Sequence, residues 1–194
     1  AIDTLYSEGC KVITDDLLYI EEPAFEDGPI AQRIDALVNH PTRPIIYTSA
    51  AGNWARDIFS FAFDPLPDQK IGIGSTWESY TIQNPGLGKY KQKFNLSTGQ
   101  VLDVMLQWDD PYLEPVSNND FDLCLVDVAS NKIVAWSTNV QDGSNTSIPF
   151  EHFSYSENPC FGQKGYKLYI TRFSTGQHNQ TPRMKLLIRG LDDS

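Results

Sequence analysis

The pattern of apolar residues changes near residue 65, and this change restricts the folds that the chain can adopt. After that point, apolar and polar residues alternate in runs at residues 102–108, 121–125, 166–170 and 184–188. Alternation with a period of two is typical of strands that bury one face. Shorter strands are expected at residues 77–82, 90–96, 133–137 and 147–150. Because turn-forming residues separate the runs, we predict an all-β antiparallel sandwich or jelly roll over residues 65–194.

Residues 1–64 differ, because helix and strand patterns alternate there. Residues 11–14 and 44–49 suit buried strands, and Asp27-Gly28-Pro29 starts a helix between them. Strand, helix and strand with short links are typical of a right-handed parallel unit. Two strands cannot complete a parallel sheet that is covered on both faces. We therefore predict a partial α/β segment whose remaining sheet comes from elsewhere. The absence of a Met before Ala1 also suggests a processed or excised piece.

The formal net charge of −10 limits the partners that this chain can have. Nucleic acids and anionic membrane surfaces are bound through clustered Lys and Arg, so neither is expected as a partner. No apolar run approaches membrane-spanning length. The three cysteines form no CxxC or Cys/His pattern, which argues against a zinc site. A Cys124–Cys160 disulfide and a set of buried free thiols both remain open.

The run IIYTSAAGN at residues 45–53 ends a β-branched strand in three small residues and one amide. Small residues at a strand end let a substrate approach the backbone closely. An Asn fixed beside them can direct its NH2 group at an oxygen atom. The alternative interpretation is a strand followed by an ordinary Gly-Asn turn.

This run, with the strand at residues 12–14 and the helix before it, resembles the middle of a subtilisin-like serine protease. Asp15-Asp16 and the sequence EPAFEDGPIAQ at residues 22–32 match one subgroup of that family closely. The resemblance covers about residues 1–60. It implies a secreted or periplasmic endopeptidase in which Asn53 forms the oxyanion hole.

The resemblance also implies a substrate pocket with two walls. They would be formed by Asp16, Leu17 and Leu18 on one side and by Ala50, Ala51 and Gly52 on the other. Carboxylates at Asp15-Asp16 would favour basic substrate side chains, or would serve only to cap the loop and a helix. Glu21, Glu22, Glu26 and Asp27 are interpreted as a solvated face before the helix.

The reacting groups of the family are absent from this chain. Neither a Gly-Thr-Ser-x-Ala motif nor a His-Gly-Thr motif occurs. His40, His152 and His178 fall at a helix end, in a sandwich connection and in a polar loop, where capping or solvent contact is usual. Acyl transfer needs a Ser-His-Asp triad. We therefore expect the chain by itself to be inactive, to require no cofactor and to depend on the remaining parts of the catalytic domain.

Residues 65–194 resemble the β-sandwich of the bacterial pre-peptidase C-terminal domain, which subtilases can carry as an insertion before the nucleophile. The resemblance rests on QWDDP at residues 107–111 and DFDL at residues 120–123. Carboxylates at one sandwich edge would suit calcium, which takes six to eight oxygen ligands. The candidate ligands are Asp109, Asp110, Asp120 and Asp122. The alternative is that these residues only cap turns.

The sequence therefore supports two hypotheses about function. The first is part of a secreted subtilisin-like serine endopeptidase that acts on protein or peptide substrates. The second is a non-catalytic binding or substrate-presenting sandwich attached to a degenerate protease remnant. Exposed aromatic side chains would serve that second role, with Tyr112, Trp136, Tyr155 and Phe161 as the candidates. Aromatic residues at strand spacing more often belong to a core. The flanking gene sequence separates the two, because only the protease requires triad motifs on both sides.

Overall fold

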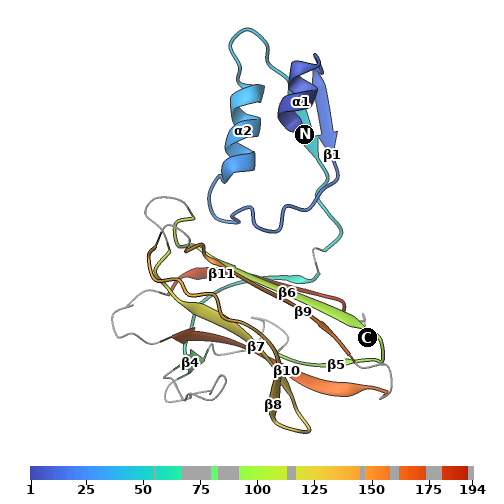
Figure 1. Cartoon of the computed structure of the whole chain (residues 1–194), viewed down its shortest axis with the longest axis vertical. Helices are drawn as coiled ribbons and strands as arrows, with labels where there is room; N and C mark the ends of the chain where they lie inside the picture. Colours follow the sequence, from blue (N-terminus) through green and yellow to red (C-terminus); the bar gives the residue numbers. More distant parts are fainter. Residues whose placement is uncertain are drawn as a thin grey trace. The chain divides into compact units, whose positions relative to one another are not determined.

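The computed structural model describes residues 1–54, 56–66, 80–82, 92–112, 117–144, 147–157, 162–173 and 181–191. The chain divides into two compact units, Ala1–Ala55 and Arg56–Ser194 (Figure 1). No helix in the described part of the chain has both the length and the apolar character needed to cross a membrane.

The first unit contains two helices and a small parallel sheet. Its elements are α1 (Ile2–Ser7), β1 (Val12–Asp15), α2 (Pro29–Val38) and β2 (Ile46–Ser49). β1 and β2 pair in parallel, from Val12 opposite Ile46 to Asp15 opposite Ser49. The predicted order of strand, helix and parallel strand is therefore confirmed, but the prediction that both strands are buried is wrong, since Val12 and Ile46 are 58% and 61% exposed. The unit has a small core, in which the buried residues Ile13, Leu37 and Ile45 pack together.

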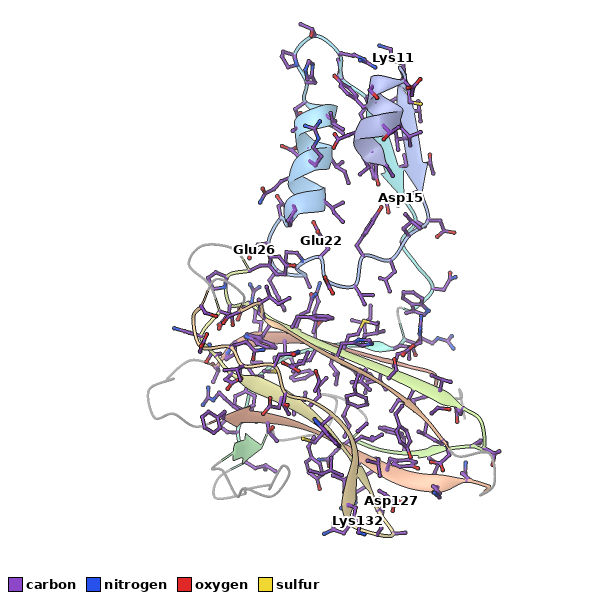
Figure 2. The ribbon with its side chains drawn as sticks, in the orientation of Figure 1. Lys11, Asp15, Glu22, Glu26, Asp127 and Lys132 are labelled. Atoms are coloured by element: carbon purple, nitrogen blue, oxygen red, sulfur yellow. The ribbon has the colours of Figure 1, made fainter. Side chains whose placement is uncertain are left out.

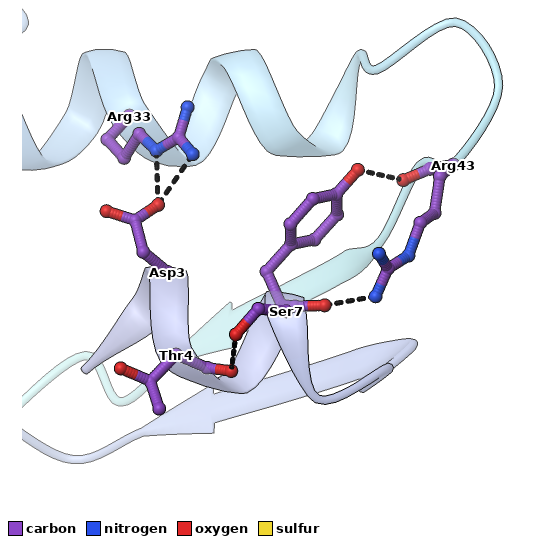
Figure 3. A network of polar contacts seen from close by, with 6 residues as sticks. Asp3, Thr4, Ser7, Arg33 and Arg43 are labelled. Atoms are coloured by element: carbon purple, nitrogen blue, oxygen red, sulfur yellow. Dashed lines mark hydrogen bonds and ion pairs between the residues drawn. The ribbon is translucent and has the colours of Figure 1, made fainter.

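Polar contacts hold the two helices and the start of β2 in place (Figure 3). Arg33 on α2 forms an ion pair with Asp3 on α1, with 2.6 Å between Nη2 and Oδ1. The Tyr6 hydroxyl donates to the carbonyl oxygen of Arg43 at 3.2 Å. In return, the Arg43 guanidinium donates to the Tyr6 carbonyl and lies 4.3 Å from the centre of the Tyr6 ring. These contacts fix the chain entering β2 against α1.

The start of α2 depends on a carboxylate from the preceding loop. Gly28 is the N-cap and provides no side-chain cap. Glu22 supplies it, since its carboxylate accepts the amides of Ala31 at 2.8 Å and Ile30 at 3.4 Å. A Cβ atom at Gly28 would lie 2.7 Å from this carboxyl group, so glycine permits the approach. The interpretation of Glu22 as part of a solvated face is therefore wrong, and Figure 2 shows it near the start of α2.

The second unit is a sandwich of two antiparallel sheets, as the alternating pattern predicts. One sheet has the order β3 (Ile58–Ala62), β11 (Arg183–Arg189), β6 (Val101–Trp108), β9 (Phe150–Ser156). The other has the order β4 (Tyr80–Ile82), β10 (Lys164–Phe173), β7 (Phe121–Asp127), β8 (Lys132–Ser137), with β5 (Lys93–Leu96) also paired to β10. The chain is therefore mostly β, with a small parallel sheet and two helices in its described residues.

The core of the sandwich is built from alternate residues of the predicted strands. On β6, Leu102, Val104 and Leu106 are completely buried, and on β7, Phe121 and Leu123 are as well. The aromatic rings meet edge to face, with 5.2 Å between the centroids of Trp108 and Phe121. Edge-to-face contact is a preferred geometry of aromatic pairs and adds to the stabilisation from apolar burial.

One strand of the second unit, β3, is absent from the sequence prediction, and another, β9, begins later than predicted. The first unit ends before the boundary placed near residue 65, because β3 pairs with β11 from Ile58 to Ala62. The strand expected at residues 147–150 is instead β9, which begins at Phe150. Residues 147–149 belong to no strand, and the Ser147 amide donates to the Ser144 carbonyl at 2.9 Å. His152 therefore lies on a strand and not in a connection.

Gly190 should be the least replaceable glycine that the structure describes at the ends of the sandwich strands. It has a φ of +96°, and a Cβ atom there would lie 1.9 Å from the carbonyl oxygen of Val101. We expect Gly190→Ala to lower the free energy of unfolding by about 3 kcal/mol or more, because backbone atoms must move. Urea denaturation followed by Trp fluorescence measures this loss.

Gly99→Ala is the matched control for that prediction. Gly99 has a φ of +76°, but a Cβ atom there meets nothing within 4 Å. Its replacement should cost only the strain of a left-handed conformation, about 1 kcal/mol. Equal losses in the two variants would contradict the role assigned to the Val101 contact.

Candidate functional site

The candidate site lies where the two parallel strands of the first unit end. Asp15 is the last residue of β1 and lies opposite Ser49, the last residue of β2. The Ala50 amide then donates to the Asp15 carbonyl oxygen at 3.1 Å. The segments that continue to Asp16 and to Asn53 therefore leave the sheet from the same edge. Ligands of parallel sheets bind at this edge, outside the carboxyl ends of the strands.

Asp15 is held in place by two side chains of β2. The Ser49 hydroxyl donates to Oδ1 of Asp15 at 2.5 Å, and the Tyr47 hydroxyl donates to Oδ2. The ring of Tyr47 packs against the core of this unit. Both oxygens of the Asp15 carboxylate are thus engaged within the unit. Asp15 joins the ends of the two strands (Figure 2).

The three residues after Asp15 face solvent. The side chains of Leu17 and Leu18 are 62% and 48% exposed, respectively. Asp16 is exposed as well, and its carboxylate has no hydrogen-bond or ion-pair partner within the part of the chain that the structure describes. One charged and two apolar side chains are therefore available to a ligand beside β1.

The residues after β2 form an open segment with small side chains. Ala50, Ala51, Gly52 and Asn53 are all exposed. Gly52 has a φ of +76°, which is strained for any other residue, and nothing lies within 4 Å of the position of its missing Cβ atom. The backbone of this segment can therefore be reached by another chain. The two segments expected to form the pocket walls thus begin at one edge of the sheet.

The two histidines that the structure describes have structural roles. His40 Nδ1 accepts the amide of Arg43 at 3.2 Å, so this ring caps the turn before β2. His152 lies on β9 in the second unit, stacked on Phe150 with 6.3 Å between the ring centroids. His178 and the Gly-Ser-Thr-Trp sequence at residues 74–77 lie outside the described residues.

Two of the four candidate calcium ligands make hydrogen bonds that hold the backbone. The Asp109 carboxylate accepts from the amide and from Nε of Arg183, each at 2.9 Å. Asp110 accepts from the Ser117 hydroxyl at 3.0 Å and from the amide and side-chain NH2 of Asn119 at 2.9 and 2.7 Å. Asp110 therefore ties together the loop before β7. This agrees with the turn-capping interpretation of both residues.

The other two candidate ligands also lie in hydrogen-bonded or buried surroundings. Asp120 Oδ1 accepts the amide of Gln141 at 3.2 Å, and Asp122 is 3% exposed on β7. Among the residues that the structure describes, no three His, Cys, Asp or Glu side chains gather where they could hold a metal ion. The calcium site therefore stays a prediction, and the described residues provide no arrangement of ligands for it.

A buried carboxyl group that the sequence pattern did not single out lies on β9. Glu151 is 0% exposed, and its Oε1 accepts the Asn139 amide and Gln141 Nε2, both at 2.9 Å. Its Oε2 accepts Asn139 Nδ2 at 3.3 Å. Burial raises the pKa of Glu151 to about 7, although hydrogen bonds from its neighbours act in the opposite direction. A sequence prediction that placed a strand at residues 150–156 would have found this buried carboxyl group. In that strand Glu151 shares the inward face with Phe153 and Tyr155.

A second buried carboxylate joins the two sheets of the sandwich. Glu157 is 1% exposed, and its Oε1 lies 3.0 Å from the ammonium group of Lys164. The Tyr155 hydroxyl lies 3.4 Å from Oε2 of Glu157 and 3.1 Å from the hydroxyl of Tyr166. Burial, and then the charge of Glu157, raise the pKa of Tyr155. Since β9 and β10 belong to different sheets, this network has a structural role.

Two of the three cysteines are free thiols. Cys10 is partly buried, whereas Cys124 is completely buried on β7. Burial, followed by the charges of Asp122 and Glu151, raises the pKa of the Cys124 thiol. A buried thiol with a raised pKa is a poor nucleophile. Cys160 lies outside the described residues.

Comparison with known proteins leaves the family of this chain open. No family model matches the chain, and no curated protein matches it. A solved structure, the VP2 subviral particle of infectious bursal disease virus, is similar over 69% of this chain and 30% of the viral chain. The sequence identity is 12% and the TM-score is 0.30. A likeness this distant supports no inference about function.

Proposed function

We propose that this chain is part of a secreted or periplasmic subtilisin-like serine endopeptidase. It would supply the oxyanion-hole residue Asn53 and both walls of the pocket for the substrate side chain. One observation carries the proposal: the parallel pairing of β1 with β2, which ends with Asp15 opposite Ser49. This register supports the assignment because it brings Asp16 and the segment from Ala50 to Asn53 to the same edge.

The chemistry proposed for this edge is stabilisation of a developing negative charge. When a serine hydroxyl attacks a peptide carbonyl, the carbonyl oxygen becomes an oxyanion, and a preplaced NH2 group lowers the energy of that transition state. Asn53 is the donor in this proposal. The small side chains of Ala50, Ala51 and Gly52 leave room for the substrate backbone beside it. The serine, histidine and aspartate of the triad come from the remaining parts of the catalytic domain.

The proposal is tested on the intact protein. This term means the whole polypeptide that the gene encodes, with residues 1–194 as one part of it. We expect it to hydrolyse casein and to be labelled by a fluorophosphonate, which reacts with activated serines. The labelled serine should lie outside residues 1–194, and the isolated chain should show neither labelling nor hydrolysis. An intact protein that never cleaves peptides, or a labelled serine within residues 1–194, would overturn the proposal.

A binding function of the sandwich is the second candidate, and one observation favours it. Trp136 on β8 is 57% exposed, and exposed tryptophans are enriched in binding surfaces. Tyr155, by contrast, packs against the core and cannot serve such a surface. An intact protein without triad motifs in its flanking sequence would leave this second candidate in place.

A further inference from the structure

We infer that the pocket beside β1 selects substrates with an arginine or lysine side chain on the amino side of the cleaved bond, and that Asp16 is the residue that selects them. The inference rests on the proposed function. It adds the substrate class and a specificity-determining residue to the same site.

The first step is the difference between the two adjacent carboxylates. Asp15 accepts hydrogen bonds from Ser49 and Tyr47 with its two oxygens, and it is committed to joining β1 and β2. Asp16 has no such partner in the described part of the chain and is exposed at the edge of the sheet. Only Asp16 is therefore available to a substrate. A sequence that merely needed a cap at this point would be served by Asp15 alone.

The second step is the apolar surface next to Asp16. Leu17 and Leu18 are 62% and 48% exposed, and the segment that follows β2 contains only Ala50, Ala51 and Gly52 before Asn53. Arginine and lysine are amphipathic: their methylene stems cover apolar surface while their charged heads remain at a polar group. A site with two leucines and one free carboxylate is complementary to both parts of such a side chain.

The third step is the free energy that it would cost to bind a substrate side chain that is apolar or acidic. An apolar substrate side chain would remove water from Asp16 without supplying a partner, which costs free energy. An acidic side chain would meet a like charge, on a chain that already carries a formal net charge of −10. A guanidinium or ammonium group instead forms a charge-assisted hydrogen bond with a carboxylate.

The test compares peptide substrates that differ only on the amino side of the cleaved bond. Arginine and citrulline form a matched pair, because citrulline keeps the shape of arginine without its charge. On the intact protein we expect kcat/KM to be at least roughly 10-fold higher for the arginine peptide. Asp16→Asn should bring this ratio close to one by lowering kcat/KM for the arginine peptide alone.

Asp27→Asn is the control variant, since it removes the same charge from an exposed position of the same unit. We expect it to keep the preference for arginine. Equal cleavage of both peptides by the unsubstituted protein would overturn the inference and leave the proposed protease function intact. An equal loss of preference in both variants would also overturn it, because net charge and not Asp16 would then select the substrate. An intact protein that cleaves no peptide would overturn the proposed function itself.

Discussion

Replacing Asn53 by alanine in the intact protein should lower kcat by roughly 100-fold or more and change KM little. An oxyanion-hole donor contacts the substrate oxygen mainly in the transition state, so its removal leaves substrate binding almost unchanged. In a subtilisin, loss of the oxyanion-hole asparagine lowers kcat by about 10²- to 10³-fold, and the proposed function gives Asn53 the same role. Steady-state kinetics with a peptide substrate measure the effect.

A structural asparagine in the same unit provides the control. Asn39 follows α2, and its side-chain NH2 donates to the carboxylate of Asp35 at 2.6 Å and to the Asp35 carbonyl at 3.1 Å. Asn39→Ala should lower the melting temperature and leave the kcat of the folded protein unchanged. If Asn53→Ala behaves in the same way, the residue only forms a turn. A melting curve is therefore needed for both variants.

The sandwich could be predicted from the sequence because burial of one face leaves a direct trace in each strand. On β6, every second residue from Leu102 to Trp108 is completely or almost completely buried, so apolar residues recur with a period of two. β3 was missed because its five residues have little polar contrast: Phe59 and Phe61 alternate with Ile58, Ser60 and Ala62. A short strand of this kind is defined by its pairing with β11 and not by its own pattern.

The polar contacts could not be predicted, because their partners are far apart along the chain. Glu22 lies nine residues before the Ala31 amide that it caps, and the Asp15 carboxylate meets the Tyr47 hydroxyl across 32 positions. Each of these carboxylates resembles a solvated or substrate-binding group when the sequence is considered alone. Only the fold shows that Asp15 is engaged and that its neighbour Asp16 is exposed.

A further consequence of the fold concerns the buried carboxyl group of Glu151, and here we expect a large effect of pH on stability. Burial raises its pKa from 4.5 to about 7 in the folded chain. Below pH 4.5 the group is protonated in both states, so its full contribution to stability is present. Between pH 4.5 and 7 the unfolded chain releases the proton while the folded chain retains it, and stability falls as the pH rises. The loss amounts to about 3 kcal/mol and is complete above pH 7.

Glu151→Gln tests this prediction because glutamine keeps a side-chain oxygen for the Asn139 amide and for Gln141 Nε2 but cannot ionise. The free energy of unfolding is measured in urea at pH 5 and at pH 8. The difference between the two values should be about 2.5 kcal/mol smaller in this variant than in the unsubstituted chain, because part of the total loss already occurs below pH 5. Glu157→Gln replaces another buried carboxyl group, but one that pairs with the Lys164 ammonium at 3.0 Å. We expect it to lower stability at both pH values, because it removes the charge that pairs with Lys164. If Glu151→Gln leaves the difference between the two pH values unchanged, the pH dependence of stability arises elsewhere.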